Sequence, residues 1–436
     1  MITNVGLLGY GTVGAGVAKI ISLEDSLLSQ KVGWSLKLAR ATVRDLDAPR
    51  AFPPPPGLLT TDPRDVVGNP DIQVVVEAMG GIEPARTLIL KALESGQNVV
   101  TANKALLAIH GVEIFAKAKE CRREIFFEAA VAGAIPVIRT LKEGLAANRI
   151  LSVFGILNGT TNYILTRMTQ DASSFQDALF EAQSHGYAEA DPTADVEGFD
   201  AAHKLIILTA LAHGVLPSLK DIQVEGITKL DAKDFDFAGE LGFTIKLLAV
   251  SARNPEDGLL EVRLHPAMIP QGHLLAGVSG VLNAVVIRGH ASGDIFLSGA
   301  GAGMMATASA VVGDIIEIAR LSHSAPAVGK PSLGWQSLTS ERIKSPTEIY
   351  TRYYLRFTVH DRPGVLAAIS GVFSAHNISI AQVIQKGVDP TGSVSLVILT
   401  HLAAEKDLQM ALSETQKLGV LTAETKLIRV EDFARY

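Results

Sequence analysis

The chain is poor in cysteine and has no long hydrophobic segment. Cys121 is the single cysteine among 436 residues, so it cannot form a disulfide within the chain, and nothing pairs it with metal-ligand spacing. No apolar run reaches the about 18 residues of a membrane-spanning helix, and the amino end lacks the basic region and cleavage site of a secretory signal. We therefore expect a cytoplasmic protein in a reducing compartment, without a membrane anchor.

An excess of positive charge is also missing. The net charge of -6 offers no general attraction to nucleic acid or to anionic lipid, because a polyanionic partner needs a basic face. A content of 47% hydrophobic and 19% charged residues is typical of a well-packed protein rather than a disordered one. The length indicates about two or three domains. These limits favour chemistry on small molecules.

A glycine-rich turn stands near the amino end. Residues 5–8 are predicted to form a buried strand, and the sequence then runs through GYGTVG into a helical pattern. This G-x-G-x-x-G between strand and helix is the fingerprint of dinucleotide binding, in which the helix N-terminus faces a pyrophosphate. A glycine turn in some other α/β protein is the alternative. We assign to the cofactor Gly9, Gly11, Thr12, Val13 and Gly14.

Further predicted strands alternate with helical patterns, at residues 36–43, 73–77, 98–101 and 124–128. Such alternation favours right-handed crossovers and a parallel sheet, so a Rossmann-like, doubly wound nucleotide-binding domain is expected. The second strand ends at Arg44, followed by an aspartate. An arginine there can pair with the 2′-phosphate of NADP, whereas an acid there is typical of NAD, so NADP is preferred and NAD stays possible. A solvated surface arginine is the alternative.

The pattern changes to an α+β mixture near residue 136, with strands predicted at residues 152–157, 222–227, 243–252 and 259–265. We predict a nucleotide-binding domain over residues 1–135, completed by a helix at about 300–322, and a substrate-binding and dimerisation domain over 136–299. Residues 323–349 are expected to be a linker, because they are polar and bracketed by prolines. The order of elements in 350–436 predicts a ferredoxin-like βαββαβ fold.

An acidic stretch, residues 185–204, ends at a lysine. A spacing of four places Asp200 and Lys204 on one face of a predicted helix, and Ile207 continues that face. Residues 205–212 contain a single polar member, a threonine, so we expect the pair to point inward. A buried lysine needs carboxylates to keep its charge, which marks a functional group; a solvated ion pair is the alternative. The carboxylates of the stretch are Glu189, Asp191, Asp195, Glu197 and Asp200.

The segment before that helix, residues 191–198, is predicted to be an irregular loop because it contains Pro192 and Gly198. Such a loop can turn Glu189 and Asp195 toward the same space. Clustered carboxylates suit a hydrolase that uses a hard metal ion, but that reading leaves the dinucleotide motif without a purpose. A substrate with an amino group fits both features, with Glu189 holding the ammonium and a lysine exchanging a proton where hydride is transferred.

A second lysine, Lys104, follows the predicted strand 98–101, at the edge where cofactor and substrate meet in such folds. A surface lysine that opens a helix is the alternative. A second glycine-rich turn, residues 299–303, precedes the helix at about 300–322. It is either a simple bend or a backbone segment close to the cofactor.

The chain resembles the homoserine dehydrogenase family over nearly its whole length, and six segments in the family's order carry the resemblance: GLLGYGTVG, VVTANKALLA, FEAAVAGAIPVI, GILNGTTNYIL, YAEADPTADVEGFDAAHKL and GAGAGMMATASAVV. The resemblance implies NAD(P)-dependent interconversion of L-homoserine and L-aspartate 4-semialdehyde by a homodimer or homotetramer. A catalytically inactive amino-acid sensor on the same fold is the alternative function.

The resemblance also implies roles for single residues. Lys204 would be the acid/base, assisted by Lys104, with Asp200 in the catalytic group. The substrate would be bound by Glu189, Asp200, Tyr187, Gly159 and Thr160. Lys104 and Gly303 would contact the cofactor. A structural sodium ion would be held, largely through backbone oxygens, by Glu128, Val131, Gly133 and Ile135.

The last part of the chain resembles an ACT regulatory domain. It carries DRPGVLA at residues 361–367 and Asn-Ile-Ser at residues 377–379. Such domains bind amino acids, which makes L-threonine the expected effector, although a purely structural dimerisation module is the alternative. The resemblance assigns regulation to Asp361, Gly364, Val365, Asn377 and Ile378.

Overall fold

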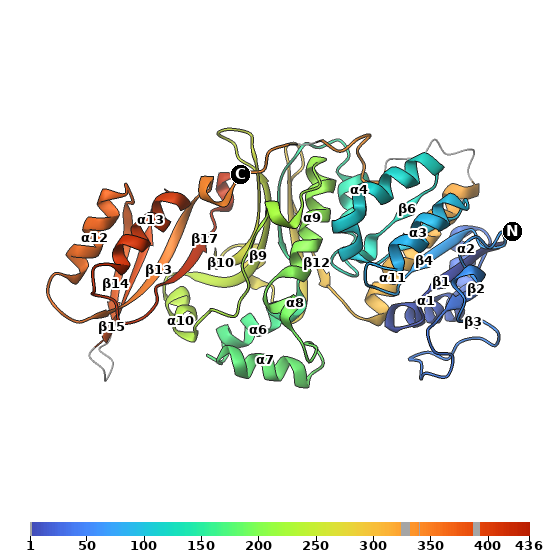
Figure 1. Cartoon of the computed structure of the whole chain (residues 1–436), viewed down its shortest axis with the longest axis horizontal. Helices are drawn as coiled ribbons and strands as arrows, with labels where there is room; N and C mark the ends of the chain where they lie inside the picture. The colour runs from blue at the N-terminus through green and yellow to red at the C-terminus, as the bar shows by residue number, and fades with distance from the viewer. Residues whose placement is uncertain (1, 324–331, 340, 387–392) are drawn as a thin grey trace.

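Three units follow one another along the long axis of the molecule (Figure 1). The structure is a computed structural model and describes residues 2–323, 332–339, 341–386 and 393–436. The N-terminal and C-terminal units lie at opposite ends, with a third unit between them. Within the described ranges, no helix has the length and hydrophobicity needed to cross a membrane.

The N-terminal unit is a parallel sheet covered by helices, as predicted. Its strands are all parallel and lie in the order β3-β2-β1-β4-β5-β6, so the strand order reverses between β1 and β4, where doubly wound folds bind ligands. The strands are β1 (Ile2–Leu8), β2 (Ser35–Thr42), β3 (Leu59–Thr60), β4 (Val74–Glu77), β5 (Asn98–Thr101) and β6 (Ile125–Phe126). The helices are α1 (Thr12–Leu23), α2 (Asp25–Val32), α3 (Ala85–Glu94) and α4 (Lys104–Cys121).

Glycines set the geometry of the first turn. Gly9 has a φ of 107°, which a residue with a side chain rarely adopts. A Cβ at Gly14 would lie 2.2 Å from the carbonyl oxygen of Gly9, and a Cβ at Gly16 would lie 2.8 Å from that of Met304. Met304 begins α11 (Met304–His323), which packs against α1. The glycines therefore let α1 lie close to both the turn and α11.

The central unit builds most of an 11-stranded sheet in the order β12-β11-β7-β9-β10-β17-β13-β15-β14, with β8 and β16 beside this path. Its strands are β7 (Ile150–Ile156), β8 (Gln223–Val224), β9 (Phe243–Arg253), β10 (Leu260–Pro270), β11 (Leu282–Gly289) and β12 (Gly293–Ala300). Its helices are α5 (Val137–Arg139), α6 (Gly159–Gln170), α7 (Phe175–Ser184), α8 (Thr193–Val196), α9 (Phe199–His213) and α10 (Ala232–Glu240).

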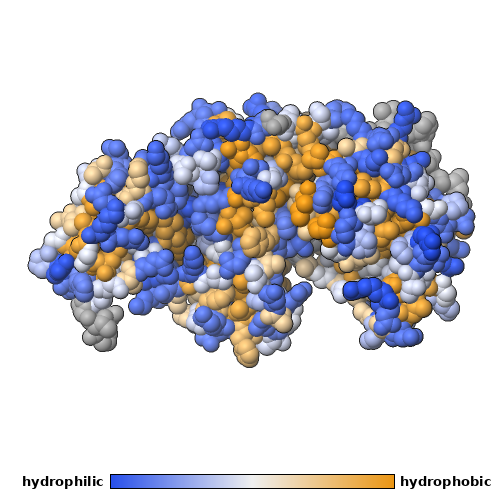
Figure 2. Space-filling view, in the orientation of Figure 1, coloured by the Kyte–Doolittle hydropathy of each residue, from blue (hydrophilic) through white to orange (hydrophobic). Residues whose placement is uncertain are grey.

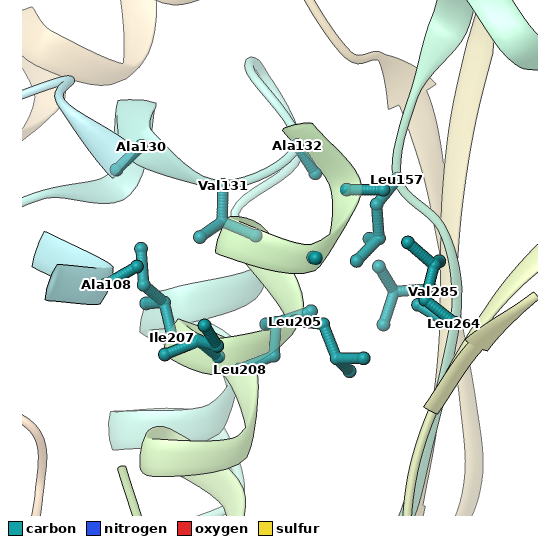
Figure 3. Packing of buried hydrophobic residues seen from close by; sticks show 14 of the residues in the cluster. Ala108, Ala130, Val131, Ala132, Leu157, Leu205, Ile207, Leu208, Leu264 and Val285 are labelled. Atoms are coloured by element: carbon teal, nitrogen blue, oxygen red, sulfur yellow. The ribbon is translucent and has the colours of Figure 1, made fainter. Parts of the chain in front are cut away.

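Helix α9 is the most deeply buried helix of the central unit. Every residue from Leu205 to His213 is buried, which confirms the inward orientation predicted for this helix. Figure 3 shows its side chains packed between Ala108 and Val131 on one side and Leu157 and Val285 on the other. On the outside, hydrophobic residues gather over the middle of the visible face in Figure 2, with hydrophilic residues toward both ends.

The C-terminal unit has the predicted βαββαβ order. It consists of β13 (Tyr350–His360), α12 (Val365–Ala375), β14 (Ile380–Lys386), β15 (Ser393–Thr400), β16 (Ala403–Ala404), α13 (Glu405–Gln416) and β17 (Lys426–Val430). Strand β17 also pairs in parallel with β10, through Ala267 with Arg429 and Met268 with Val430. The sheets of the central and C-terminal units are therefore continuous, which the sequence did not predict.

The last residues of the chain return to the central unit. The ring of Phe433 stacks on His273 with centroids 3.6 Å apart and meets Phe154 edge-on at 4.7 Å. The guanidinium of Arg288 donates to the carbonyl oxygen of Tyr436 at 2.6 Å. The predicted linker 323–349 is described only in part, and there the Trp335 indole donates to the Leu211 carbonyl at 2.9 Å. The central core thus includes the chain's final residues.

Two local predictions were wrong in detail. The segment expected to be an irregular loop contains the one-turn helix α8, because a proline restricts the residue before it and can precede a helix, as Pro192 does here. The strand predicted over residues 222–227 has only the two residues of β8 in the sheet. Strands β11 and β12 were not predicted at all.

Candidate functional site

Lys204 and Asp200 form a buried ion pair on α9. Nζ of Lys204 donates to Oδ2 of Asp200 and to the Leu157 carbonyl oxygen, both at 2.7 Å. The lysine is only 8% exposed, so it is shielded from bulk water. Leu157 follows β7, which means that the end of a sheet strand and a helix face together fix this amine. The solvated pair considered from the sequence is excluded.

Lys104 reaches the same carboxylate from the nucleotide-binding unit. Its Nζ lies 3.1 Å from Oδ1 of Asp200. Lys104 begins α4 directly after β5, and Asn103 caps that helix by accepting from the Leu106 amide. Strands β1, β4 and β5 are parallel, so Lys104 and the turn at Gly9 lie at the same edge of the sheet. Asp200 therefore bridges two lysines where the two units meet.

The pKa values of the two carboxylates in this cluster, Asp200 and Asp195, are shifted in opposite directions. Burial opposes ionisation of Asp200, but the charges of Lys204 and Lys104 and hydrogen bonds from Lys204 and Asn158 outweigh it and hold its pKa well below the usual range. Burial raises the pKa of Asp195, and the negative charge of Asp200 raises it further. Asp200 is thus held as an anion beside both lysines, whereas Asp195 protonates at a higher pH than an ordinary aspartate.

Asn158 links these two acids and was missed in the sequence. Its Nδ2 donates to Oδ1 of Asp195 at 2.7 Å and to Oδ2 of Asp200 at 2.9 Å. It also caps α6, because its Oδ1 accepts from the Thr161 amide at 2.8 Å. An asparagine before a predicted helix signals a cap, but no local pattern signals the carboxylates 37 and 42 residues away.

The expected substrate residues lie around the start of α6. Gly159 opens that helix, and a Cβ there would lie 2.7 Å from the Val281 carbonyl oxygen. The Thr160 hydroxyl donates to the Tyr187 carbonyl at 2.6 Å, which ties α6 to the loop before α8. Glu189 is exposed in that loop, and in the part of the chain that the structure describes its carboxylate does not contact the lysines.

The segment expected to hold sodium is a tight turn against the second glycine-rich turn. Gly133 has a φ of 58°, and a Cβ there would lie 2.5 Å from the Gly301 carbonyl oxygen. The Glu128 carboxylate accepts from the backbone amides of Ile138 and Arg139, at 2.8 and 2.9 Å. Its side chain therefore caps α5, which leaves backbone oxygens to coordinate a cation.

Carbonyl oxygens suited to a cation are present in this turn. Among the described residues, the carbonyls of Val131 and Gly133 accept no hydrogen bond, whereas that of Ile135 accepts from the Val137 amide at 2.7 Å. The described residues contain no group of three or more His, Cys, Asp or Glu side chains that could hold a metal ion.

The other predicted residues occupy element ends. Arg44 is exposed, two residues after β2. Gly303 has a φ of 124° and directly precedes α11. In the C-terminal unit, Gly364 caps α12 with a φ of 93° and Asn377 follows the same helix with a φ of 55°. The regulatory candidates Asp361, Gly364, Val365, Asn377 and Ile378 therefore flank the two ends of α12.

A parallel sheet with a dinucleotide turn, and a buried lysine held at its edge by a carboxylate, define a nicotinamide-dependent dehydrogenase. Family models match three parts of the chain: the NAD binding domain of homoserine dehydrogenase over residues 9–128, homoserine dehydrogenase over 136–316, and the ACT domain over 353–420. The chain belongs to the homoserine dehydrogenase family. Its activity is that of an oxidoreductase acting on a CH–OH group with a nicotinamide cofactor.

Similar proteins match over nearly their whole lengths. The homoserine dehydrogenase of Neisseria gonorrhoeae is 44% identical and that of Pseudomonas aeruginosa 43%, each over 98% of both chains. The crystal structure of a homoserine dehydrogenase from Thiobacillus denitrificans aligns with a TM-score of 0.94 and 43% identity over 99% of both chains. A Staphylococcus aureus homoserine dehydrogenase aligns with a TM-score of 0.76 and 32% identity over 99% of both.

Replacing Gly14 with alanine is expected to weaken cofactor binding. The added Cβ would lie 2.2 Å from the Gly9 carbonyl oxygen, so the turn must open, at a cost of about 1–3 kcal/mol. Titration of NADPH fluorescence measures the change in Kd. Gly313→Ala is the matched control, because a Cβ there meets nothing within 4 Å. Equal affinities in both variants would show that the turn does not hold the cofactor.

Proposed function

We propose that Lys204 is the acid/base in the interconversion of L-homoserine and L-aspartate 4-semialdehyde. The observation that carries this proposal is the Asp200 carboxylate, which lies 2.7 Å from Nζ of Lys204 and 3.1 Å from Nζ of Lys104. When bound, the nicotinamide exchanges a hydride with the substrate carbon that bears the oxygen. Lys204 accepts the hydroxyl proton during oxidation and returns it during reduction.

The Asp200 carboxylate between the two lysines stabilises the positive charge that forms during this mechanism. As Lys204 takes up the proton it becomes an ammonium, which the buried Asp200 stabilises in a site shielded from water. Lys104 is partly exposed, with 38% of its side chain accessible, and we assign it to contact with substrate and cofactor. Substrate oxidation leaves two cations beside one carboxylate, so a second acid, Asp195, helps to balance the charge.

We assign substrate binding to residues around the start of α6: Gly159, Thr160, Tyr187, Glu189 and Asp200. The helix N-terminus at Gly159 provides free backbone amides that suit the substrate carboxylate. Glu189 is an exposed carboxylate in the neighbouring loop and would hold the substrate ammonium. Its lack of a partner among the described side chains leaves it available for that role.

We propose NADP as the preferred cofactor, because Arg44 stands exposed after β2, where it can pair with a 2′-phosphate. In addition to Arg44, we assign cofactor contact to Gly9, Gly11, Thr12, Val13, Gly14, Lys104 and Gly303. A Cβ at Gly11 would meet nothing within 4 Å, so the turn is open on the side that a pyrophosphate needs. We also assign a structural sodium ion to the turn of Glu128, Val131, Gly133 and Ile135, supported by its free carbonyls.

We propose a homodimer or homotetramer located in the cytoplasm. Strand β12 is an edge of the large sheet and exposes Phe296, and Leu282 of the neighbouring β11 is also exposed. An unpaired strand edge with apolar side chains is suited to association with a second copy. Cys121 is free, which agrees with a reducing compartment. We retain the domain boundaries proposed from the sequence for the nucleotide-binding, central and C-terminal units.

We further propose that L-threonine regulates the enzyme through the C-terminal unit. Arg429 on β17 donates to Glu225 at 2.8 Å, beside β8 of the central unit. The next residue, Gly226, is packed so closely under α8 that a Cβ would lie 2.3 Å from the Val196 carbonyl oxygen. Val196 adjoins Asp195, so a shift of β17 would reach the carboxylates of the site through packed backbone.

Replacing Glu225 with glutamine is expected to reduce threonine inhibition while basal activity is retained. The change weakens the contact with β17, but Arg429 keeps its buried partner Glu405 at 2.8 Å. Threonine titrations of homoserine oxidation measure the effect. Glu240→Gln is the matched control, because Glu240 of the central unit also pairs with a residue of the C-terminal unit, Lys386, but at an exposed position away from β8. Unchanged inhibition in Glu225→Gln would contradict this route.

Homoserine oxidation tests the proposed function as a whole. The purified protein is mixed with L-homoserine and either NADP or NAD, and formation of the reduced nicotinamide is followed by its absorbance. We expect turnover when homoserine and either cofactor are present, with a higher kcat/KM for NADP than for NAD. No turnover is expected when homoserine is omitted. Failure to reduce either cofactor would refute the assignment of the site.

A further inference from the structure

Asn158 occupies the space between the two acids of the site. It is 5% exposed, and both hydrogens of its amide are used, one toward Oδ1 of Asp195 and one toward Oδ2 of Asp200. The two acids come from different elements, α8 and α9. A single side chain therefore bridges the two acids.

The orientation of the Asn158 amide is fixed by the hydrogen bonds that its oxygen accepts. Oδ1 of Asn158 accepts from the Thr161 backbone amide at 2.8 Å and from the Thr161 hydroxyl at 3.0 Å. A flipped amide would place its oxygen against two carboxylates and its NH₂ group against a backbone N–H. Only one orientation satisfies all four contacts, so the donors must face Asp195 and Asp200.

The consequence for Asp200 is a fixed rotation of its carboxylate. Oδ2 accepts hydrogen bonds from Nδ2 of Asn158 at 2.9 Å and from Nζ of Lys204 at 2.7 Å, while Oδ1 lies 3.1 Å from Nζ of Lys104. Lysine ammonium groups are point charges on flexible chains and impose little direction on a carboxylate. The directional donor in the cluster is therefore the amide of Asn158.

Asp195 depends on Asn158 even more strongly. In the described part of the chain it forms no ion pair within 4.0 Å, although it is half-buried and faces the negative charge of Asp200. An acid in this position needs neutral donors to keep its anion, and the Asn158 amide is the larger contributor of the two that lower its pKa, ahead of the Thr160 hydroxyl.

We propose that Asn158 is a positioning residue that aligns Asp200 between Lys204 and Lys104 and holds Asp195 beside them. The proposal rests on the assignment of Lys204 as the acid/base. In this role Asn158 contacts neither hydride nor transferred proton. It acts by keeping the carboxylates in the geometry that the lysines require, and misplacement of such groups by about 1 Å costs about 100-fold in rate.

Asn158→Asp separates this role from helix capping. Aspartate caps a helix as well as asparagine does, so α6 keeps its start. The variant loses both donors and adds a third negative charge next to Asp195 and Asp200. We expect kcat for homoserine oxidation to fall by about 10- to 100-fold, with a smaller change in the KM for NADP. Ser174→Asn, a cap exchange at α7, is the matched control and should leave kcat unchanged.

The pH dependence provides a readout that a structural role would not move. The groups that face the cluster are Asp195, Asp200, His203 and Lys204 from α8 and α9, and Lys104 from α4. Hydrogen bonds from Asn158 lower the pKa of both aspartates. Without them, as in Asn158→Ala, these acids protonate at higher pH. The acidic limb of the kcat profile is therefore expected to move to higher pH.

Thr161→Val is a second variant that keeps Asn158 but removes one of the two donors that orient its amide. It should lower kcat in the same direction by a smaller factor, with α6 intact by circular dichroism. Unchanged kcat and an unchanged pH profile in Asn158→Asp and Thr161→Val would overturn the proposal. A wild-type protein that does not oxidise homoserine would instead refute the proposed function, whatever these variants do.

Discussion

Replacing Lys204 with alanine is expected to lower kcat for homoserine oxidation by about 10²- to 10⁴-fold, the usual contribution of a positioned acid/base. The variant removes an amine that is 8% exposed and hydrogen bonded to Asp200, so water at bulk concentration cannot easily replace it. Cofactor affinity should stay near that of the wild type, because the glycine turn belongs to a separate sheet. Steady-state kinetics and a fluorescence titration of NADPH measure the two quantities.

A second buried lysine provides the control. Lys344 is 6% exposed and pairs with Asp257 at 2.7 Å, away from the glycine turn and from Asp200. Lys344→Met removes a buried cation in the same way, but turnover of the folded protein should be retained. Equal losses of kcat and of NADPH affinity in Lys204→Ala would indicate a structural lysine and contradict the assignment.

Replacing Glu431 with glutamine is expected to destabilise the protein by about 3–5 kcal/mol, the usual effect of breaking a buried ion pair from one side. Arg263 is fully buried, and its guanidinium donates to both oxygens of Glu431, at 2.7 and 3.1 Å. The nearest other carboxylate, Glu261, lies 4.0 Å from its Nε. Without Glu431 the buried cation loses its bidentate partner. Denaturant unfolding measures the shift in midpoint.

Two further variants test this explanation. Replacing the pair with Arg263→Met and Glu431→Leu removes both charges together and should recover much of the lost stability. Asp62→Asn breaks the ion pair with Arg64, which is well exposed, and should leave the midpoint unchanged. A midpoint for Glu431→Gln equal to that of the wild type would show that this pair does not hold β10 to the C-terminal unit.

The continuity of the large sheet changes how regulation should be tested. Deleting residues 350–436 would remove β17 from the edge of β10, and with it Phe433 and the buried partner of Arg263. Loss of activity in such a truncation would report damage to the central core as well as loss of an effector site. Point substitutions at the interface, such as Glu225→Gln, avoid this ambiguity.

Features controlled by neighbouring residues could be predicted from the sequence. The glycine turn needs only the strand before it and the helix after it, and Gly9 adopts the left-handed conformation that only glycine tolerates well. The pairing of Asp200 with Lys204 follows from the helical repeat, and the apolar residues after Lys204 set the direction in which it points. Lys104 was placed by the rule for strand ends in parallel sheets.

Features that join distant parts of the chain could not be predicted. The pairing of β10 with β17 connects residues more than 150 positions apart, and two strands with similar apolar patterns carry no information on their partner. Asn158 has a clear local signal only as a helix cap, whereas its donors reach two acids brought together by the fold. Asp195 was predicted to lie in an irregular loop that turns it toward the same space as Glu189, whereas in the structure it lies on α8 and accepts a hydrogen bond from Asn158.

Some assignments depend on sequence position or on the family resemblance rather than on contacts in the structure. Glu189 is exposed and stays a prediction for the substrate ammonium. The carbonyls of Val131 and Gly133 suit a hard cation such as sodium. Arg44 favours NADP through its position after β2 alone. These residues lie at surfaces or in turns that a ligand would complete, which explains why packing within the chain does not determine their roles.

Chemical rescue of Lys204→Ala tests the proton-transfer role most directly. Removal of the side chain leaves space beside Asp200, where a small primary amine can bind and take over the proton. Single-turnover hydride transfer from homoserine to NADP is measured with increasing methylamine. We predict a slow rate without the amine and a rise toward a saturating, faster rate with it. Hydride transfer in the variant at the wild-type rate, without any amine, would contradict the role of Lys204.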